Sequence, residues 1–375
     1  MSAWRIPFNR PTLLGSEFDY MRMALESGRL SGGGAFSARA EKTLERQVGA
    51  ARVLLTPSGT AALEMAALLL RLQPGGEVIV PSFTFVSTAN AFYQFGARIV
   101  FADIRPDTLN IDERQVRQLI TPRTRAIVAV HYAGVGADMK ALLDFNVPVI
   151  EDNAHGLFGR SGNKPLGSFG SAAATSFHET KSFTCGEGGA LILNQPAWIE
   201  RAEILREKGT NRNQFFLGQV DKYTWVDRGS SYLPSELSAA FLLAQLERCD
   251  EVQTRRRILW ERYARELEGW ACASAVRLPY IPADCDQAFH MFYLLLPSNE
   301  ARNRLIAHLA ARGILAVFHY VPLDSSPAGR EAGVAPLGCP VTADISARLV
   351  RLPFFTGLSE EDQTEVIRAV REFSP

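Results

Sequence analysis

The sequence predicts an α/β protein with a mostly parallel central sheet and a smaller C-terminal α/β domain. Between residues 50 and 195, short β-rich runs alternate with longer Ala- and Leu-rich runs, which is typical of a parallel sheet with helices on its faces. Hydrophobic residues make up 47% of the chain and charged residues 21%, a balance that excludes a disordered or collagen-like protein. At about 150 residues per domain, 375 residues correspond to two or three domains.

The elements of the first part follow in order along the chain. Strands are predicted at 52–55, 77–80, 97–101, 126–131, 147–151 and 173–177, and helices at 60–72, 87–95 and 138–144. In a sheet of this kind the ligand site lies just beyond the carboxyl ends of the strands. Residues that directly follow a strand are therefore the first candidates for a functional site.

The pattern changes after about residue 195. A polar and aromatic segment, 210–232, has little periodicity. Helices are predicted at 199–208, 235–268, 301–312, 343–351 and 360–373, and strands at 290–296 and 314–320. We therefore expect a large domain at 1–245 and a small domain at 246–375.

Charge and cysteine content narrow the range of partners. Lys and Arg number 40, as do Asp and Glu, and no basic run is present, so nucleic acid is not expected as a partner. The apolar runs fall far short of the roughly 18 residues that span a bilayer, and no signal-peptide core opens the chain. Five scattered cysteines without CxxC spacing predict neither disulfides nor zinc. We expect a cytoplasmic protein with no metal and no membrane contact.

The first candidate motif is Pro57-Ser58-Gly59-Thr60, between a strand and a helix. The first amides of a helix lack partners and its dipole end is positive, so the turn is a ready anion site. An ordinary helix N-cap explains the same residues.

The second motif is EDNAHG at the end of the strand 147–151. An acidic side chain at the mouth of a buried strand needs a partner, and a cationic ring nitrogen would serve. Alternatively, Asp152 caps the next element or pairs with an arginine, and His155 is a satisfied polar group.

The third motif is SFHETKSFTCGEGGAL, in which Lys181 follows a strand and precedes a glycine-rich turn. A partly desolvated lysine has a lowered pKa and forms a Schiff base with a carbonyl. The alternative is a solvated surface lysine. Together the three motifs supply what a pyridoxal 5'-phosphate (PLP) enzyme requires: an anion cup, an acidic partner for a pyridine nitrogen, and a lysine.

The order and spacing of SGTAAL, PSFTFVSTANA, EDNAH and SFHETK…GEGG resemble the DegT/DnrJ/EryC1/StrS sugar aminotransferases over residues 6–373. The resemblance implies the fold-type-I architecture of PLP-dependent aminotransferases. Within the family, segments 206–225 and 318–323 are most similar to members that make dTDP-4-amino-4,6-dideoxygalactose.

The resemblance also implies roles for individual residues. Lys181 would bond to the cofactor, Asp152 would keep its pyridine nitrogen protonated, and His155 would lie beside the ring and its phenolic oxygen. Phe85 would stack on the ring. The phosphate would be held by the amides of Gly59 and Thr60 and the hydroxyl of Ser176, and His319 and Tyr320 would contact substrate or form a buried strand-end pair.

Two positions depart from the family pattern. Many relatives carry an asparagine that reaches the neighbouring subunit's phosphate, whereas the matching position here is Leu233, with Ser230 or Ser231 as substitutes. Asp324 stands where relatives commonly have histidine, so a sugar-binding role is not transferred to it. The family forms dimers, and we expect a homodimer with sites at its interface and with segment 210–232 reaching the partner's site.

The resemblance implies transfer of an amino group from glutamate to the 4-keto carbon of a dTDP-4-keto-6-deoxyhexose, in deoxysugar biosynthesis. The product is a dTDP-4-amino-4,6-dideoxyhexose of galacto or gluco configuration. The alternatives are an aminotransferase for a 3-keto or UDP-linked sugar, or a cofactor-binding regulator without turnover. A family dehydratase is a further rival, but it lacks the lysine that Lys181 provides.

Overall fold

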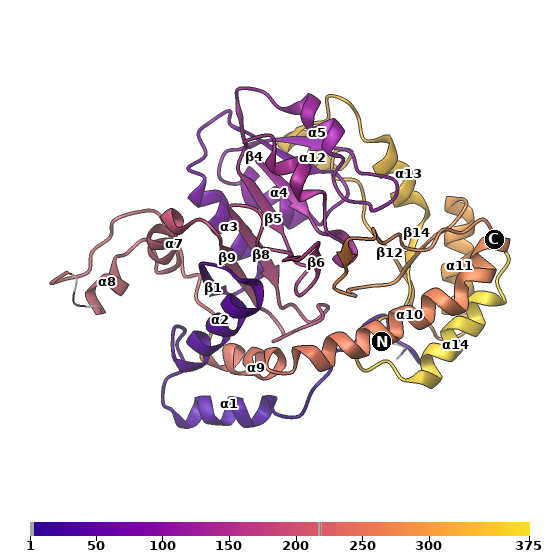
Figure 1. The fold of residues 1–375 in the computed structure, drawn as a ribbon, viewed down its shortest axis with the longest axis horizontal. Coiled ribbons are helices and arrows are strands. Elements are labelled where there is room, and N and C mark those ends of the chain that lie inside the picture. Colours follow the sequence, from indigo (N-terminus) through magenta and orange to yellow (C-terminus); the bar gives the residue numbers. More distant parts are fainter. Residues whose placement is uncertain (1–3, 217, 219) are drawn as a thin grey trace.

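The computed structural model describes residues 4–216, 218 and 220–375 and is built on an eight-stranded sheet (Figure 1). Neighbouring strands are parallel except around β9, which is antiparallel to both β1 and β8. The mostly parallel sheet that the sequence predicts is thus confirmed. In spatial order the strands are β1 (Arg52–Thr56), β9 (Gly189–Leu193), β8 (Ala172–Ser176), β5 (Val149–Asp152), β4 (Thr124–Val130), β2 (Glu77–Pro81), β3 (Arg98–Ala102) and β13 (Gly333–Val334).

Helices cover both faces of this sheet because successive strand side chains alternate between two apolar cores. Val78 and Val80 of β2 belong to one core, and Ile79 between them belongs to the other. The first core includes α3 (Gly59–Leu69), α4 (Val86–Tyr93) and α7 (Ile199–Arg206). The opposite face is covered by α2 (Ala35–Val48), α5 (Glu113–Leu119), α6 (Met139–Leu143) and α9 (Glu236–Leu246).

The C-terminal part has its own sheet and core. Antiparallel strands β11 (Tyr293–Leu295), β14 (Leu349–Arg351) and β12 (Val317–Phe318) form the sheet. Its apolar core is completed by Ile6 from the N-terminal segment and by helices α10 (Cys249–Ala273), α11 (Asn299–Ala310) and α14 (Glu360–Arg371). The boundary at residue 245 stays a prediction, because α10 runs on directly from α9 (Figure 1).

Several elements differ from the sequence prediction. Residues 349–351 are strand rather than the end of a helix, because the backbone turns extended at Leu349. The helix predicted at 235–268 is two helices, which break between Leu246 and Cys249. The remaining elements are short or were not predicted: α1 (Glu17–Glu26), η1 (Tyr132–Gly134), β6 (Arg160–Ser161), β7 (Lys164–Pro165), η2 (Pro196–Trp198), α8 (Arg212–Phe216), β10 (Cys285–Asp286), α12 (Pro327–Ala332) and α13 (Pro340–Arg348).

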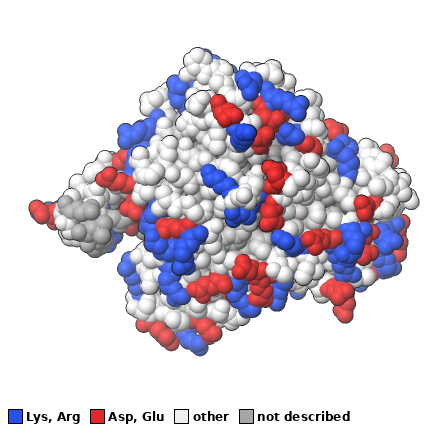
Figure 2. Space-filling view, viewed as in Figure 1, with Lys and Arg blue, Asp and Glu red and all other residues white. Residues whose placement is uncertain are grey.

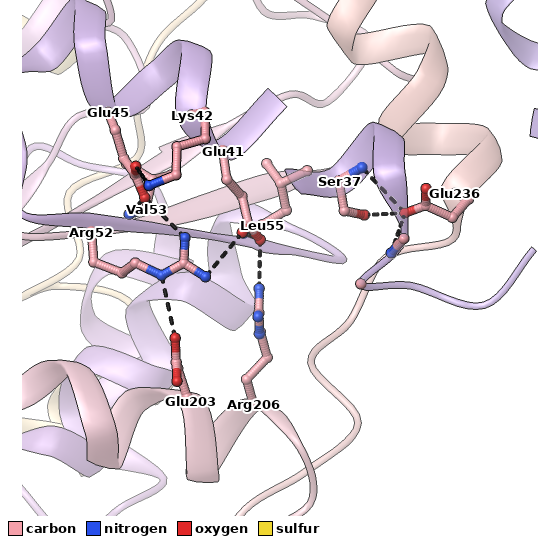
Figure 3. A network of polar contacts seen from close by, with 12 residues as sticks. Ser37, Glu41, Lys42, Glu45, Arg52, Val53, Leu55, Glu203, Arg206 and Glu236 are labelled. Carbon is pink, nitrogen blue, oxygen red and sulfur yellow. Dashed lines mark hydrogen bonds and ion pairs between the residues drawn. The ribbon is translucent and has the colours of Figure 1, made fainter. Parts of the chain in front are cut away.

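A buried ion-pair network fixes α2 and α7 to the edge strand β1 (Figure 3). Glu41 of α2 accepts from Arg206 at 2.6 Å and from the amide of Leu55 at 3.1 Å, and it pairs with Arg52 at 3.3 Å. Arg52 also pairs with Glu45 and Glu203. Removing one partner of such a buried pair leaves an uncompensated charge, which costs about 3–5 kcal/mol. The network therefore fixes the strand that leads into the first candidate motif.

On the face shown in Figure 2, basic and acidic side chains are interspersed, in keeping with equal numbers of each. Among the described residues, no helix combines the length and the apolar composition that crossing a membrane requires.

Candidate active site

A cavity of about 790 Å³ lies at the carboxyl ends of β1, β4, β5 and β8, between the large sheet and the small C-terminal sheet. It is the place at which a parallel sheet of this kind binds ligands. All nine residues that the sequence analysis assigned to the site line this cavity: Gly59, Thr60, Phe85, Asp152, His155, Ser176, Lys181, His319 and Tyr320. They come from segments more than 250 residues apart in sequence, from Gly59 to Tyr320.

The turn before α3 forms a cradle of backbone amides. Ser58 caps the helix, because its hydroxyl accepts from the amide of Ala61 at 3.0 Å. The motif is therefore a helix N-cap, and this role is compatible with an anion site at the same turn. A Cβ on Gly59 would come within 2.9 Å of the Ser176 Cβ, so glycine is needed for this close approach. Thr60 Oγ1 lies 2.8 Å from Ser87 Oγ. The turn is half-buried in the cavity wall, and its amides and hydroxyls are the groups that a phosphate would use.

Asp152 is 6% exposed and lies at the end of β5. Thr88 Oγ1 donates to Asp152 Oδ2 at 2.7 Å, and the amide of Ala154 donates to Oδ1 at 3.2 Å. Since Thr88 uses its proton on the carboxylate, the 2.8 Å contact with Thr84 Oγ1 makes Thr84 the donor to Thr88. These bonds hold the carboxylate oriented at the cavity wall, and no arginine pairs with it among the described residues.

Lys181 lies in a loop that follows β8 and is closed at its base by backbone hydrogen bonds. Phe177 donates its amide to Gly188 O at 2.7 Å and accepts from Cys185 at 3.1 Å. Gly186 turns the chain with φ +84°, in the left-handed region. Desolvation lowers the pKa of Lys181 to about 8, opposed by the nearby Asp152 and reinforced by Arg351. A solvated surface lysine would show no such shift.

His155 stacks on His290, with ring centroids 4.2 Å apart and planes 14° apart. Its Nδ1 is buried and has no hydrogen-bond partner among the described residues. Desolvation, with smaller effects from Lys181 and Arg351, holds the pKa of His155 well below its usual value, so the ring is neutral. His319 is held by a 3.0 Å contact between its Nδ1 and Tyr132 Oη.

The cavity fits PLP on these observations. A buried, unpartnered His155 Nδ1 needs a polar group in the cavity, and the glycine cradle leaves room for a phosphate. A carboxylate for the ring nitrogen and an amine of lowered pKa face the same space.

The residues that line the cavity and were not predicted include Phe8 and Asn9 near the N-terminus, His290 before β11 and Arg351 at the end of β14. None of these four lies in a motif with glycine or a strand-end acid, so no local signal pointed to them.

The departures from the family pattern lie outside the cavity lining. Asp324 is bonded to Ser82, whose Oγ contacts Asp324 Oδ1 at 2.5 Å and accepts from its amide at 3.1 Å, which fixes the loop after β2. Leu233 packs beside Gly32, and neither it nor Ser230 nor Ser231 lines the cavity of its own chain. Segment 210–232 contains α8 and projects from the body of the molecule (Figure 1); its positions 217 and 219 lie outside the described residues.

Comparison with known proteins places this geometry in a family. The model of the DegT/DnrJ/EryC1/StrS aminotransferase family matches residues 12–371. The spore coat polysaccharide biosynthesis protein SpsC of Bacillus subtilis (strain 168) is 31% identical, with 98% of this chain and 96% of SpsC covered.

Solved structures share the fold over nearly the whole chain. The aminotransferase TlmJ of Streptoalloteichus hindustanus is 29% identical, with a TM-score of 0.89 and 98% of each chain covered. Spr1654 of Streptococcus pneumoniae, solved in PLP and PMP forms, is 26% identical, with TM-scores of 0.89 and 0.90 and coverage of 98% of this chain and 97–98% of its own. These likenesses confirm the fold-type-I prediction, the cofactor and the enzyme class. The chain belongs to the DegT/DnrJ/EryC1/StrS aminotransferase family and is a PLP-dependent aminotransferase.

Proposed function

We propose that the enzyme transfers the amino group of glutamate to the 4-keto carbon of a dTDP-4-keto-6-deoxyhexose, giving a dTDP-4-amino-4,6-dideoxyhexose. Transamination is supported by one observation: the amine of Lys181, whose pKa is lowered, lines the same cavity as the oriented carboxylate of Asp152. A cofactor-binding regulator without turnover has no need for either feature.

Each proposed cofactor contact is made by a residue that lines the cavity. Gly59, Thr60 and Ser176 hold the phosphate, Asp152 holds a proton on the ring nitrogen, and His155 donates to or accepts from the phenolic oxygen. Phe85, which is 57% exposed at the cavity, covers one face of the ring. Bound PLP supplies an aldehyde that carries the amino group and a ring that withdraws electrons.

The chain's own chemistry centres on Lys181 Nζ. With the cofactor and glutamate bound, Lys181 would be a free neutral amine, which would take the proton from the donor's α-carbon and hand that proton on to the cofactor. The same amine performs the reverse proton transfer when the ketosugar enters. A pKa of about 8 suits both directions, since the amine exchanges protons easily near neutral pH.

The sugar substrate is supported by membership of the family and by segments 206–225 and 318–323. His319 and Tyr320, from the second of these segments, line the cavity with Tyr320 half-buried, where a hexose would contact them. A pocket that hydrogen-bonds a nucleotide and a hexose rejects ketones that lack them, because its polar groups would stay unpaired.

We also propose a homodimer that covers the cavity mouth. Phe85, Phe318 and Val321 line the cavity and are 57%, 52% and 60% exposed, and Val86 beside them is 56% exposed. Apolar side chains gathered in this way favour a protein partner. The projecting segment 210–232 is suited to reach that partner's site (Figure 1).

The acceptor is tested by single turnover. Enzyme converted to the PMP form is mixed with dTDP-4-keto-6-deoxyglucose, its 3-keto isomer, a UDP-linked 4-keto sugar or pyruvate. Rapid recovery of the PLP absorbance is expected with the dTDP-linked 4-keto sugar alone. NMR of the product then assigns the galacto or gluco configuration. A clear preference for the 3-keto or the UDP-linked sugar would show that the enzyme is another member of the family.

A further inference from the structure

Arg351 is a cation in the active-site cavity, and it has no counter-ion in the part of the chain that the structure describes. It lies at the end of β14, lines the cavity and is half-buried. No carboxylate pairs with it among the described residues, and its buried Nε has no hydrogen-bond partner there. Its Nη2 donates a long hydrogen bond of 3.4 Å to the carbonyl of Phe318. A guanidinium carries five N–H donors, so most of its bonding capacity is unused.

The guanidinium is nevertheless held in place. Its central carbon lies 4.5 Å from the centre of the Phe8 ring, which packs over one face of the guanidinium. Burial lowers the pKa of Arg351, as expected for a charge that lacks a counter-ion. Its charge acts in turn on Lys181, His155, His290 and His319, whose pKa values it lowers.

A second buried arginine shows what a structural role looks like. Arg256 is 3% exposed and donates to the carbonyls of Phe289 and His290 at 2.9 and 2.6 Å and to Thr356 at 3.3 Å. Its donors are used within the fold. The contrast indicates that the partner of Arg351 comes from outside the chain.

From this geometry we infer that Arg351 binds the α-carboxylate of the amino donor. The inference rests on the proposed function in that a donor amino acid reacts at Lys181. A bidentate guanidinium–carboxylate pair would satisfy the unused donors. The α-carboxylate is attached to the carbon whose proton Lys181 removes, so it is next to the lysine amine. A diphosphate would be separated from the reacting carbon by a whole hexose ring.

The proposed role of Arg351 agrees with the need to bind two different substrates in one cavity. A donor carboxylate and a neutral hexose occupy the same cavity in turn. An arginine on the small sheet, outside the cofactor cradle, can bind the carboxylate of the donor without binding the sugar. The ketosugar half-reaction should therefore depend little on Arg351.

The test uses PLP-loaded wild type, Arg351→Gln, Arg351→Lys and the control Arg302→Gln. Arg302 is also half-buried, also has an unpartnered Nε and lies 5.9 Å from the ring of Phe318, but it does not line the cavity. Stopped-flow absorbance gives the second-order rate of conversion by L-glutamate and by L-alanine. Calorimetry gives the affinity for succinate, which binds without reacting. Circular dichroism checks the fold.

Arg351→Gln is expected to slow conversion by both amino acids about 10²-fold and to weaken succinate binding at least about tenfold, with partial recovery in Arg351→Lys. Arg302→Gln should behave as wild type. A loss confined to glutamate would assign the distal carboxylate instead. Loss in the ketosugar half-reaction together with weaker dTDP binding would place the diphosphate at Arg351. Wild type that reacts with glutamate but not with the ketosugar would overturn the proposed acceptor alone.

Discussion

At the scale of single residues, the covalent role of Lys181 can be isolated. Lys181→Ala should retain PLP through the phosphate cradle and Asp152 but lose transamination, because no other amine lines the cavity among the described residues. Borohydride reduction of wild type followed by peptide mapping should place the label on Lys181. Label on Lys140, Lys164 or Lys208 would refute the assignment.

The pKa of Lys181 predicts a pH dependence. Only a neutral amine bonds to an aldehyde, and a pKa of about 8 instead of 10.5 raises the neutral fraction near pH 7 by roughly 10²-fold. The rate at which PLP bonds to the apoenzyme should therefore rise with pH and level off above about 8. A rate that continued to climb to pH 10 would mean that the lysine is solvated.

Asp152→Asn should fold, since the amide keeps an oxygen to accept from Thr88. A neutral amide does not hold the ring nitrogen protonated, so turnover should fall by several orders of magnitude while PLP affinity falls much less. Both quantities are read from one titration and one single-turnover series. Near-normal turnover would show that Asp152 does not act on the ring nitrogen and serves only as a capping residue.

The part of the site that depends on local sequence could be predicted from the residues alone. Asp152 and Lys181 were found because each follows a strand and has a recognisable neighbourhood. Arg351 and His290 were missed because their function depends on how the small sheet faces the large one. The arrangement of the two sheets depends on packing between segments that are distant in sequence, and no periodic pattern in the sequence predicts it.

At the scale of elements, the close packing of β9 against the phosphate cradle is testable. Gly189 pairs with Thr56 on β1 and Ser176 on β8, and a Cβ there would lie 2.3 Å from the carbonyl carbon of Ser58. Gly189→Ala must push the Ser58 turn outward. We expect a loss of about 1–3 kcal/mol in the free energy of unfolding and at least tenfold weaker PLP binding.

A matched glycine provides the control. Gly269 lies within α10 and has open space where a Cβ would go. Gly269→Ala should leave PLP binding unchanged and stabilise the helix slightly. Unchanged PLP affinity in Gly189→Ala would show that the cradle is insensitive to β9, and an equal loss in both variants would show that the effect is not specific to the cradle. Urea unfolding and a PLP titration measure the two effects.

Helices and strands could be predicted where the spacing of apolar residues was clear. They could not be predicted where contacts with distant segments determine the secondary structure. The strands from β1 to β8 in the large sheet lie close to their predicted positions, because their runs are buried and, apart from the alanine-rich β8, contain β-branched and other large apolar residues. Residues 349–351 continue a helical apolar pattern, yet pairing with Tyr293–Leu295 draws them into a strand. Tertiary pairing overrode local propensity there.

At the scale of the whole molecule, the proposed dimer predicts a sedimenting mass near twice the 41.3 kDa of the chain. Trp225, 79% exposed on the projecting segment, is suited to the partner, so Trp225→Glu should shift the equilibrium toward monomer and lower turnover. Ile258→Glu is the control, because Ile258 on α10 is also a large apolar residue and is 60% exposed. A monomeric wild type with full turnover would contradict the dimer.

The two-residue strand β13 has a consequence for biosynthesis. It pairs in parallel with β3 at one end of the eight-stranded sheet, although it lies more than 230 residues further along the chain. During translation the rest of the sheet can assemble while β3 still presents open backbone groups, which are a template for aggregation until they are covered. The last quarter of the chain thus closes the sheet against misassembly, and a product that stops before Gly333 should be found with chaperones or in the insoluble fraction.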